Sequence, residues 1–159
     1  MKDIKPNITY HLYAYDELIE ADQHLVDAAK EATFRSYAPY SHFKVGAAAK
    51  LANGEVVCGS NQENAAYPSG TCAERTTLFY ANSTYPDVAV EAIAIAARNA
   101  LDEFTPQATA PCGACRQVML ETERRGKKPL RTLLYGAEGI LEIACVEDLL
   151  PLSFDASSM

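Results

Sequence analysis

"KVGAAAKLANGEVVCGSN", residues 44–61, places two short apolar segments on either side of an Asn-Gly pair. Asn-Gly between two such segments is a strong short-range signal for a β-hairpin, because both residues tolerate the positive φ angles that tight turns require. We therefore predict two strands joined at Asn53-Gly54. The second strand brings Asn61 to one end of the sheet.

Helix and strand signals alternate on both sides of this hairpin. Residues 16–35 carry Leu18, Leu25 and Ala29 at helical spacing with charges between them, which predicts an amphipathic helix. Further along we predict helices over about 71–82 and within 111–126, strands at 91–97, 131–136 and 141–146, and a short helical turn within 147–154. This order favours a single α/β domain in which helices cover a mixed sheet.

Composition excludes several classes of protein. With 159 residues, 48% of them hydrophobic and 22% charged, the chain is typical of one soluble globular domain spanning residues 1–159. Fourteen basic and 21 acidic residues give a net charge of −7, which opposes binding to nucleic acid or to an anionic membrane. The one dense basic cluster, within residues 124–128, lies where a helix should end, which favours a solvated helix terminus.

The cellular compartment also follows from the sequence as an expectation. Charges are scattered through residues 1–20, and no apolar run approaches the ~18 residues of a membrane span, so we expect a cytoplasmic protein. Five cysteines in that compartment indicate metal binding, catalysis or buried thiols more than disulfides. Cys58 and Cys145 fall inside apolar strands, where we expect them to be small core residues.

The other three cysteines lie near predicted helix starts. Cys72 is two residues before Glu74, although Thr71 and Glu74 also match a capping box that would satisfy free amides. Cys112 and Cys115 are three apart, so a helix places both sulfurs on one face. A thioredoxin-like redox pair would leave Cys72 unexplained, and a structural zinc site would need a fourth ligand.

Three cysteine ligands leave one coordination position open. An open position is the mark of a catalytic zinc site, where the metal activates a water molecule. A carboxylate next to that position, here Glu74, can accept a proton and return it during the reaction.

These residues resemble the motifs of the zinc-dependent cytidine deaminases. The two halves are CAER, residues 72–75, and PCGACRQ, residues 111–117, and cysteine rather than histidine at position 72 resembles the small homotetrameric nucleoside deaminases. The resemblance runs from about residue 40 to 154. Residues 1–15 would then be an N-terminal extension and 155–159 a flexible tail, and the loop between Arg98 and Pro111 is longer than is usual in the family.

The resemblance implies a fold, a metal and a set of site residues. It implies a three-layer sandwich, one Zn²⁺ per subunit and a homotetramer with shared active sites. By resemblance, the zinc ligands are Cys72, Cys112 and Cys115, and the catalytic residue is Glu74. Asn61 and Glu63 would contact the ribose, Phe43 would contact the pyrimidine, and the backbone at Ala73 would contact the cytosine edge. Tyr67 and Phe154 would reach the active site of a neighbouring subunit.

Three thiolates weaken zinc as a Lewis acid, because together they outweigh its charge. Arg75 and Arg116 directly follow Glu74 and Cys115. We hypothesise that both arginines donate hydrogen bonds to the ligand sulfurs and withdraw negative charge from the metal. The alternative is a surface or interface ion pair.

The expected reaction is hydrolytic deamination of cytidine and deoxycytidine to uridine and deoxyuridine, with release of ammonia, in pyrimidine salvage. The sequence Asn-Gln-Glu-Asn at 61–64 favours a nucleoside substrate. Three alternatives remain: a blasticidin S-type deaminase of a related cytosine nucleoside, a structural-zinc interaction module, and a thiol oxidoreductase.

Overall fold

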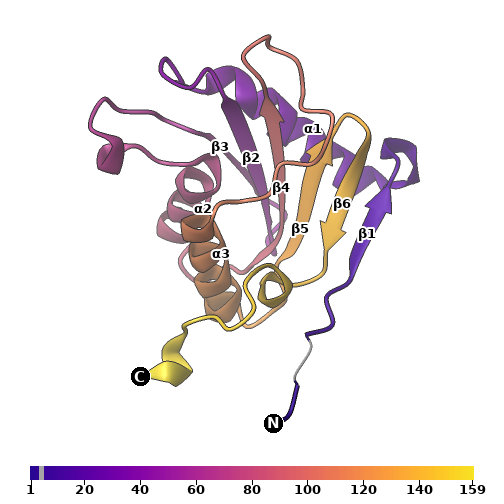
Figure 1. The fold of residues 1–159 in the computed structure, drawn as a ribbon, viewed down its shortest axis with the longest axis vertical. Helices are drawn as coiled ribbons and strands as arrows, with labels where there is room; N and C mark the ends of the chain where they lie inside the picture. Colours follow the sequence, from indigo (N-terminus) through magenta and orange to yellow (C-terminus); the bar gives the residue numbers. More distant parts are fainter. Residues whose placement is uncertain (4–5) are drawn as a thin grey trace.

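The computed structural model describes residues 1–3 and 6–159; residues 4 and 5, within the predicted N-terminal extension, lie outside the described residues. One six-stranded sheet with strand order β1-β6-β5-β4-β2-β3 forms the middle layer. Helix α1 covers one face of the sheet, and α2 and α3 cover the other (Figure 1). The predicted α/β sandwich with a mixed sheet is confirmed. The elements are β1 Tyr10–Tyr13, α1 Glu20–Ala32, β2 Lys44–Leu51, β3 Val56–Ser60, α2 Ala73–Thr84, β4 Val90–Arg98, α3 Gly113–Gly126, β5 Arg131–Gly136 and β6 Gly139–Ile143.

The predicted hairpin is formed by β2 and β3. These strands pair antiparallel from Gly46 opposite Ser60 to Lys50 opposite Val56, and Gly54 in the turn has a φ of 90°. Strand β4 is antiparallel to β2 and parallel to β5. One side of the sheet, formed by strand ends, therefore holds the starts of β2 and β6 and the ends of β3, β4 and β5 (Figure 1). We call this side the upper edge.

Small residues in the central strands let the helices approach the sheet. Alanines fill much of β2 and β4 and are buried on both faces. Gly46 lies against the backbone at the end of α1: a Cβ built on it would lie 2.2 Å from the carbonyl oxygen of Ala29 and 2.6 Å from the amide nitrogen of Thr33. The backbone of α1 therefore packs directly on β2.

The structure differs from the sequence predictions near the N-terminus. The first helix is shorter than predicted, and short 3-10 turns at Tyr15–Glu17 and Thr33–Arg35 flank it. Strand β1, which the sequence analysis did not predict, pairs antiparallel with β6. Most of its side chains are exposed, so it lacks the apolar pattern of a buried strand. Part of the extension thus belongs to the sheet.

Cys58 also differs from expectation. Its side chain is exposed on β3, and β3 is an edge strand that is only partly covered. The prediction that Cys145 lies inside a strand is also wrong, because β6 ends at Ile143 and the half-buried Cys145 directly precedes the 3-10 turn Val146–Leu149.

Among residues 1–3 and 6–159, the helices are all too short or too polar to cross a membrane.

The contact at Gly46 predicts a large effect of one added methyl group. Gly46→Ala should lower the free energy of unfolding by about 1–3 kcal/mol, because the neighbouring atoms are backbone and cannot rotate away. Urea denaturation followed by circular dichroism measures this change. The control is Gly113→Ala, where the new Cβ meets no atom within 4 Å. An equal loss in both variants would contradict this account of the packing between α1 and β2.

Candidate active site

Two helices begin at the upper edge of the sheet with a cysteine at the N-cap. Cys72 caps α2 and Cys112 caps α3, and neither side chain makes a capping hydrogen bond. The capping box that Thr71 and Glu74 match in sequence is not formed, because Cys72 rather than Thr71 occupies the N-cap and the Thr71 hydroxyl donates to the Cys72 carbonyl at 3.5 Å. Both cysteine sulfurs are therefore left for another partner.

Three sulfurs meet between the two helix starts. The Sγ of Cys112 lies 3.9 Å from that of Cys72 and 3.4 Å from that of Cys115, and all three sulfurs are within 4.8 Å of one another. Tetrahedral thiolate ligands about 2.3 Å from zinc would be roughly 3.8 Å apart, so this spacing fits one zinc ion. Within the part of the chain that the structure describes, no fourth Cys, His, Asp or Glu joins the group.

The positive end of each helix and one arginine surround the sulfurs. Nη2 of Arg75 donates to Cys72 Sγ at 3.7 Å. The pKa of Cys72 is lowered to about 5, because the thiol of Cys115 and the guanidinium of Arg75 donate to its sulfur. The pKa of Cys115 is raised, because its proton is shared with Cys72 and its side chain is buried. A thiolate held in this way is ready to accept a cation.

Glu74 lies in the first turn of α2 and is only 4% exposed. Burial raises the pKa of its carboxyl group, and the negative charge of Cys72 raises it further. The carboxyl group is thus beside the thiols and largely removed from solvent.

The two arginines have different roles. Arg75 makes the expected sulfur contact, and its Nε is buried without a hydrogen-bond partner. Arg116 instead donates from Nε to the Pro111 carbonyl and from Nη1 to the Leu149 carbonyl, both at 2.8 Å. The expected contact of Arg116 with a sulfur is replaced by contacts that fix the segment before Cys112. Arg116 follows Cys115 by one residue, so the two side chains leave the helix in different directions.

Asn61 and Glu63 lie just after β3, where Asn61 holds the start of β2 and Glu63 holds the turn before it. The Asn61 side chain donates to the Phe43 carbonyl at 2.9 Å and accepts from Val45 N at 2.8 Å and from the Ser36 hydroxyl at 2.6 Å. One carboxylate oxygen of Glu63, Oε2, accepts the backbone amides of Tyr40 and Ser41 at 2.9 and 3.2 Å.

The pKa of Glu63 is lowered by the hydrogen bond from the Ser41 hydroxyl and by the Tyr40 amide. Its carboxylate is therefore an acceptor, and its other oxygen, Oε1, makes none of these backbone contacts.

Phe43 is half-buried and follows a residue of unusual conformation. His42 has a φ of 55°, in the left-handed region that non-glycine residues seldom adopt. The amide of Phe43 is held by the Ser41 hydroxyl at 3.0 Å. The sequence analysis did not single out Ser36 or His42.

The remaining predicted contacts are divided between buried and exposed positions. Ala73 is fully buried at the start of α2. Tyr67, in a 3-10 turn, and Phe154, in the C-terminal segment, are 79% and 60% exposed. The side-chain amide of Gln117 donates to the Phe154 carbonyl at 2.9 Å, which ties that segment to α3.

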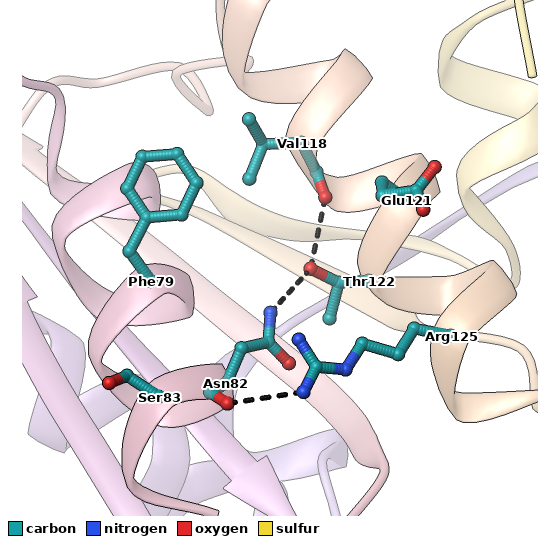
Figure 2. Close-up of a pocket in the computed structure, with 7 residues that line it drawn as sticks. All are labelled: Phe79, Asn82, Ser83, Val118, Glu121, Thr122 and Arg125. Carbon is teal, nitrogen blue, oxygen red and sulfur yellow. Dashed lines mark hydrogen bonds between the residues drawn. The ribbon is translucent and has the colours of Figure 1, made fainter. Parts of the chain in front are cut away.

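A groove of about 380 Å³ lies between α2 and α3, away from the thiols. Phe79 and Val118 form its apolar part, and Figure 2 shows them facing each other from the two helices. The polar part is joined by hydrogen bonds from Asn82 to the Thr122 hydroxyl at 3.1 Å and from Arg125 to the Asn82 carbonyl at 3.3 Å (Figure 2).

Comparison of this chain with known proteins identifies one family. A model of the family described as "Cytidine and deoxycytidylate deaminase zinc-binding region" matches residues 19–127, which include Glu74 and the three clustered cysteines. A cytidine deaminase of Halalkalibacterium halodurans is 40% identical over 139 residues, covering 86% of this chain and 96% of that protein. One of Sporosarcina psychrophila is 37% identical over 135 residues, with 85% and 92% covered.

Solved structures agree with the sequence comparison. The crystal structure of cytidine deaminase from Burkholderia pseudomallei is similar with a TM-score of 0.72 and 41% identity, covering 86% of this chain and all of that one. The structure of cytidine deaminase from Mycobacterium tuberculosis has a TM-score of 0.64 and 32% identity, with 86% and 98% covered.

The sulfur cluster predicts which cysteines control metal binding. Cys115→Ala should weaken zinc binding by at least about 100-fold, because removing even a group that only supports a ligand costs about 10–100-fold. Competition with a chromophoric chelator measures the affinity. Cys58→Ala is the control, since this thiol lies outside the cluster and should not affect zinc. Equal affinities in the two variants would rule out the cluster as the metal site.

Proposed function

This chain belongs to the cytidine and deoxycytidylate deaminase zinc-binding family, and on that basis we propose that it hydrolyses cytidine and deoxycytidine to uridine and deoxyuridine with release of ammonia. The observation that carries the proposal is the buried carboxyl group of Glu74 next to three convergent thiols with no fourth protein ligand among the described residues. A structural-zinc module would be expected to close the fourth position with a side chain.

We assign zinc binding to Cys72, Cys112 and Cys115. Zinc supplies Lewis acidity that lowers the pKa of a coordinated water to about 7. Glu74 takes a proton from the attacking water and places a proton on N3 of the cytosine ring, which makes C4 electrophilic. The water oxygen bonds to C4, and Glu74 then takes the remaining water proton from the new C4 hydroxyl and gives it to the exocyclic nitrogen. The bond from C4 to that nitrogen breaks as the C4 carbonyl forms, and the nitrogen leaves as ammonia.

The sugar and base contacts follow from atoms that the protein leaves free. Oε1 of Glu63, which takes no part in the backbone contacts to Oε2, would accept a ribose hydroxyl. Asn61 has one amide hydrogen left after its contact with Phe43. Phe43 would pack on the pyrimidine, and the backbone at Ala73 would meet the cytosine edge. These sugar contacts favour cytidine or deoxycytidine over a blasticidin S-type cytosine nucleoside, whose sugar is different.

Arg75 compensates the charge of the three thiolates. Its hydrogen bond to Cys72 Sγ draws electron density from that ligand. The two helix N-termini add about half a positive charge each. A zinc ion bound by these cysteines would then be a stronger Lewis acid than three thiolates alone would allow.

The assigned role of Glu74 predicts a loss of rate without a loss of metal. Glu74→Gln should lower kcat by at least about 100-fold, because general acid–base catalysis contributes about 10²–10⁴-fold. Zinc content and the unfolding midpoint should stay close to those of the unmodified protein. Conversion of cytidine to uridine is followed by ultraviolet absorbance, with Glu55→Gln in the exposed hairpin turn as the control. Near-full turnover in Glu74→Gln would refute the role.

We propose a cytoplasmic homotetramer that acts in pyrimidine salvage. Support for association comes from aromatic side chains exposed around α2 and the C-terminal segment, namely Tyr67, Phe79, Tyr80 and Phe154. Phe79 lines the groove of Figure 2, where a second copy would bury it. Tyr67 and Phe154 would complete the active site of a neighbouring subunit.

Shared active sites predict complementation between two defective chains. Phe154→Ala alone should raise KM about 3- to 10-fold, the value of one aromatic contact. Co-expressed Glu74→Gln and Phe154→Ala chains, purified through two tags, should regain sites with the lower KM, since Glu74 and Phe154 come from different chains at each site. Hybrids that keep the KM of Phe154→Ala would place Phe154 in its own subunit's site or outside any site.

A further inference from the structure

The loop between β4 and α3 crosses from one face of the sheet to the other and ends at Cys112. Phe104 packs against the core on the α1 side, whereas Ala108 packs against the core under α2 and α3. Between them the loop crosses the upper edge over Gly136, where an added Cβ would lie 2.5 Å from Ala108 N and 2.6 Å from Gln107 C. The position of Cys112 therefore depends on how this crossing is held.

On the α1 side, the loop is held by an aromatic cage around Lys30. Its Nζ lies 4.9 Å from the ring centre of Tyr135, 5.4 Å from that of Phe104 and 5.6 Å from that of Tyr15. These rings come from the end of β5, the loop and the N-terminal segment. The Lys30 side chain is 28% exposed, and a cation shielded from water interacts more strongly with aromatic faces.

Hydrogen bonds fix the members of this cage. The Tyr15 hydroxyl donates to Asp27 at 2.6 Å, and Asp27 pairs with Lys30 at 3.5 Å. The rings of Phe104 and Tyr135 pack edge to face with centres 5.4 Å apart. The ammonium group of Lys30 thus connects α1 with the N-terminal segment, the loop and β5.

The backbone continues this anchorage to the crossing itself. Ala137 N donates to the Thr105 carbonyl and Glu138 N donates to the Pro106 carbonyl, both at 2.9 Å. At the far end of the loop, Arg116 holds the Pro111 carbonyl. Hydrogen bonds therefore hold the loop both before and after it crosses the upper edge.

A second ion pair joins the tip of this loop to the wall of the proposed substrate site. Asp102 pairs with Lys44 and, at 3.5 Å, with Arg98. Its φ of 64° is in the left-handed region, which aspartate adopts more readily than most residues other than glycine. Lys44 directly follows Phe43.

We propose that Lys30 is a positioning residue that, through Phe104 and Tyr15, holds the loop so that Cys112 stays in place to bind zinc. The N-terminal segment is then part of the metal site's support, although Tyr15 lies before the region matched by the family model. The inference rests on the proposed function, since it takes zinc as the metal at the three cysteines.

The test compares zinc release in paired variants. Lys30→Met removes the charge but keeps side-chain length, and Tyr15→Leu removes one ring of the cage. Both should release zinc to an excess of chromophoric chelator about 10-fold faster, the lower end of the cost of losing a group that supports a ligand. Both should also speed amide hydrogen exchange in residues 103–111. Lys30→Arg keeps the cation, so its rate of zinc release should stay within about twofold of that of the unmodified protein.

Tyr10→Ala is the matched control, because this exposed tyrosine lies in the same N-terminal segment but outside the cage. Equally fast zinc release in Tyr10→Ala would overturn the proposal in favour of a general effect on stability. Faster loop exchange with unchanged zinc release would also overturn it, since the loop would then not position Cys112.

The two proposals can fail separately in this experiment. An unmodified protein that binds zinc but does not convert cytidine would refute the proposed function and leave both readouts of the cage valid, because neither uses substrate. A protein that binds no zinc would overturn both proposals.

Discussion

The convergence of two helix N-termini on one group of sulfurs is the constraint on which the rest of the structure depends. Strand β3 ends at the upper edge and β4 begins at the lower one, so α2 must start at the upper edge. Strands β4 and β5 are parallel, so α3, which links them, must start there too. The orphan amides and dipoles of both helices then favour negative charge at the same point, where Cys72 and Cys112 are the caps.

Around this point, polar side chains combine support of the backbone with proposed substrate contacts. Asn61 and Glu63 hold the start of β2 and the turn before it, and each has an atom that these backbone contacts do not use, namely one amide hydrogen of Asn61 and Oε1 of Glu63. Glu74 differs because it is buried beside the thiols, and this burial raises the pKa of its carboxyl group. A site built in this way is rigid, since moving a substrate-facing group would also break a contact inside the protein.

Local signals predicted most of the elements, whereas contacts between distant segments were harder to foresee. The hairpin, both motif helices and the buried strands have a periodicity or a turn dipeptide that can be read within about ten residues. Strand β1 has no such pattern, because the hydrogen bonds to β6 rather than apolar burial define it. The partners of Arg116 depend on where Leu149 lies, and the exposure of Cys58 depends on β3 being an edge strand.

The sequence by itself determined the chemistry of the site: three thiols, a carboxylate two residues after one of them, and the start of a helix at each motif. These features are local, because capping and spacing along a helix act over only a few residues. Only the tertiary structure decided that Cys72 and Cys112, 40 residues apart, bring their sulfurs within 3.9 Å. That distance depends on the direction of β4 and β5 and on the loop's path over Gly136, which are set by packing between segments remote in the chain.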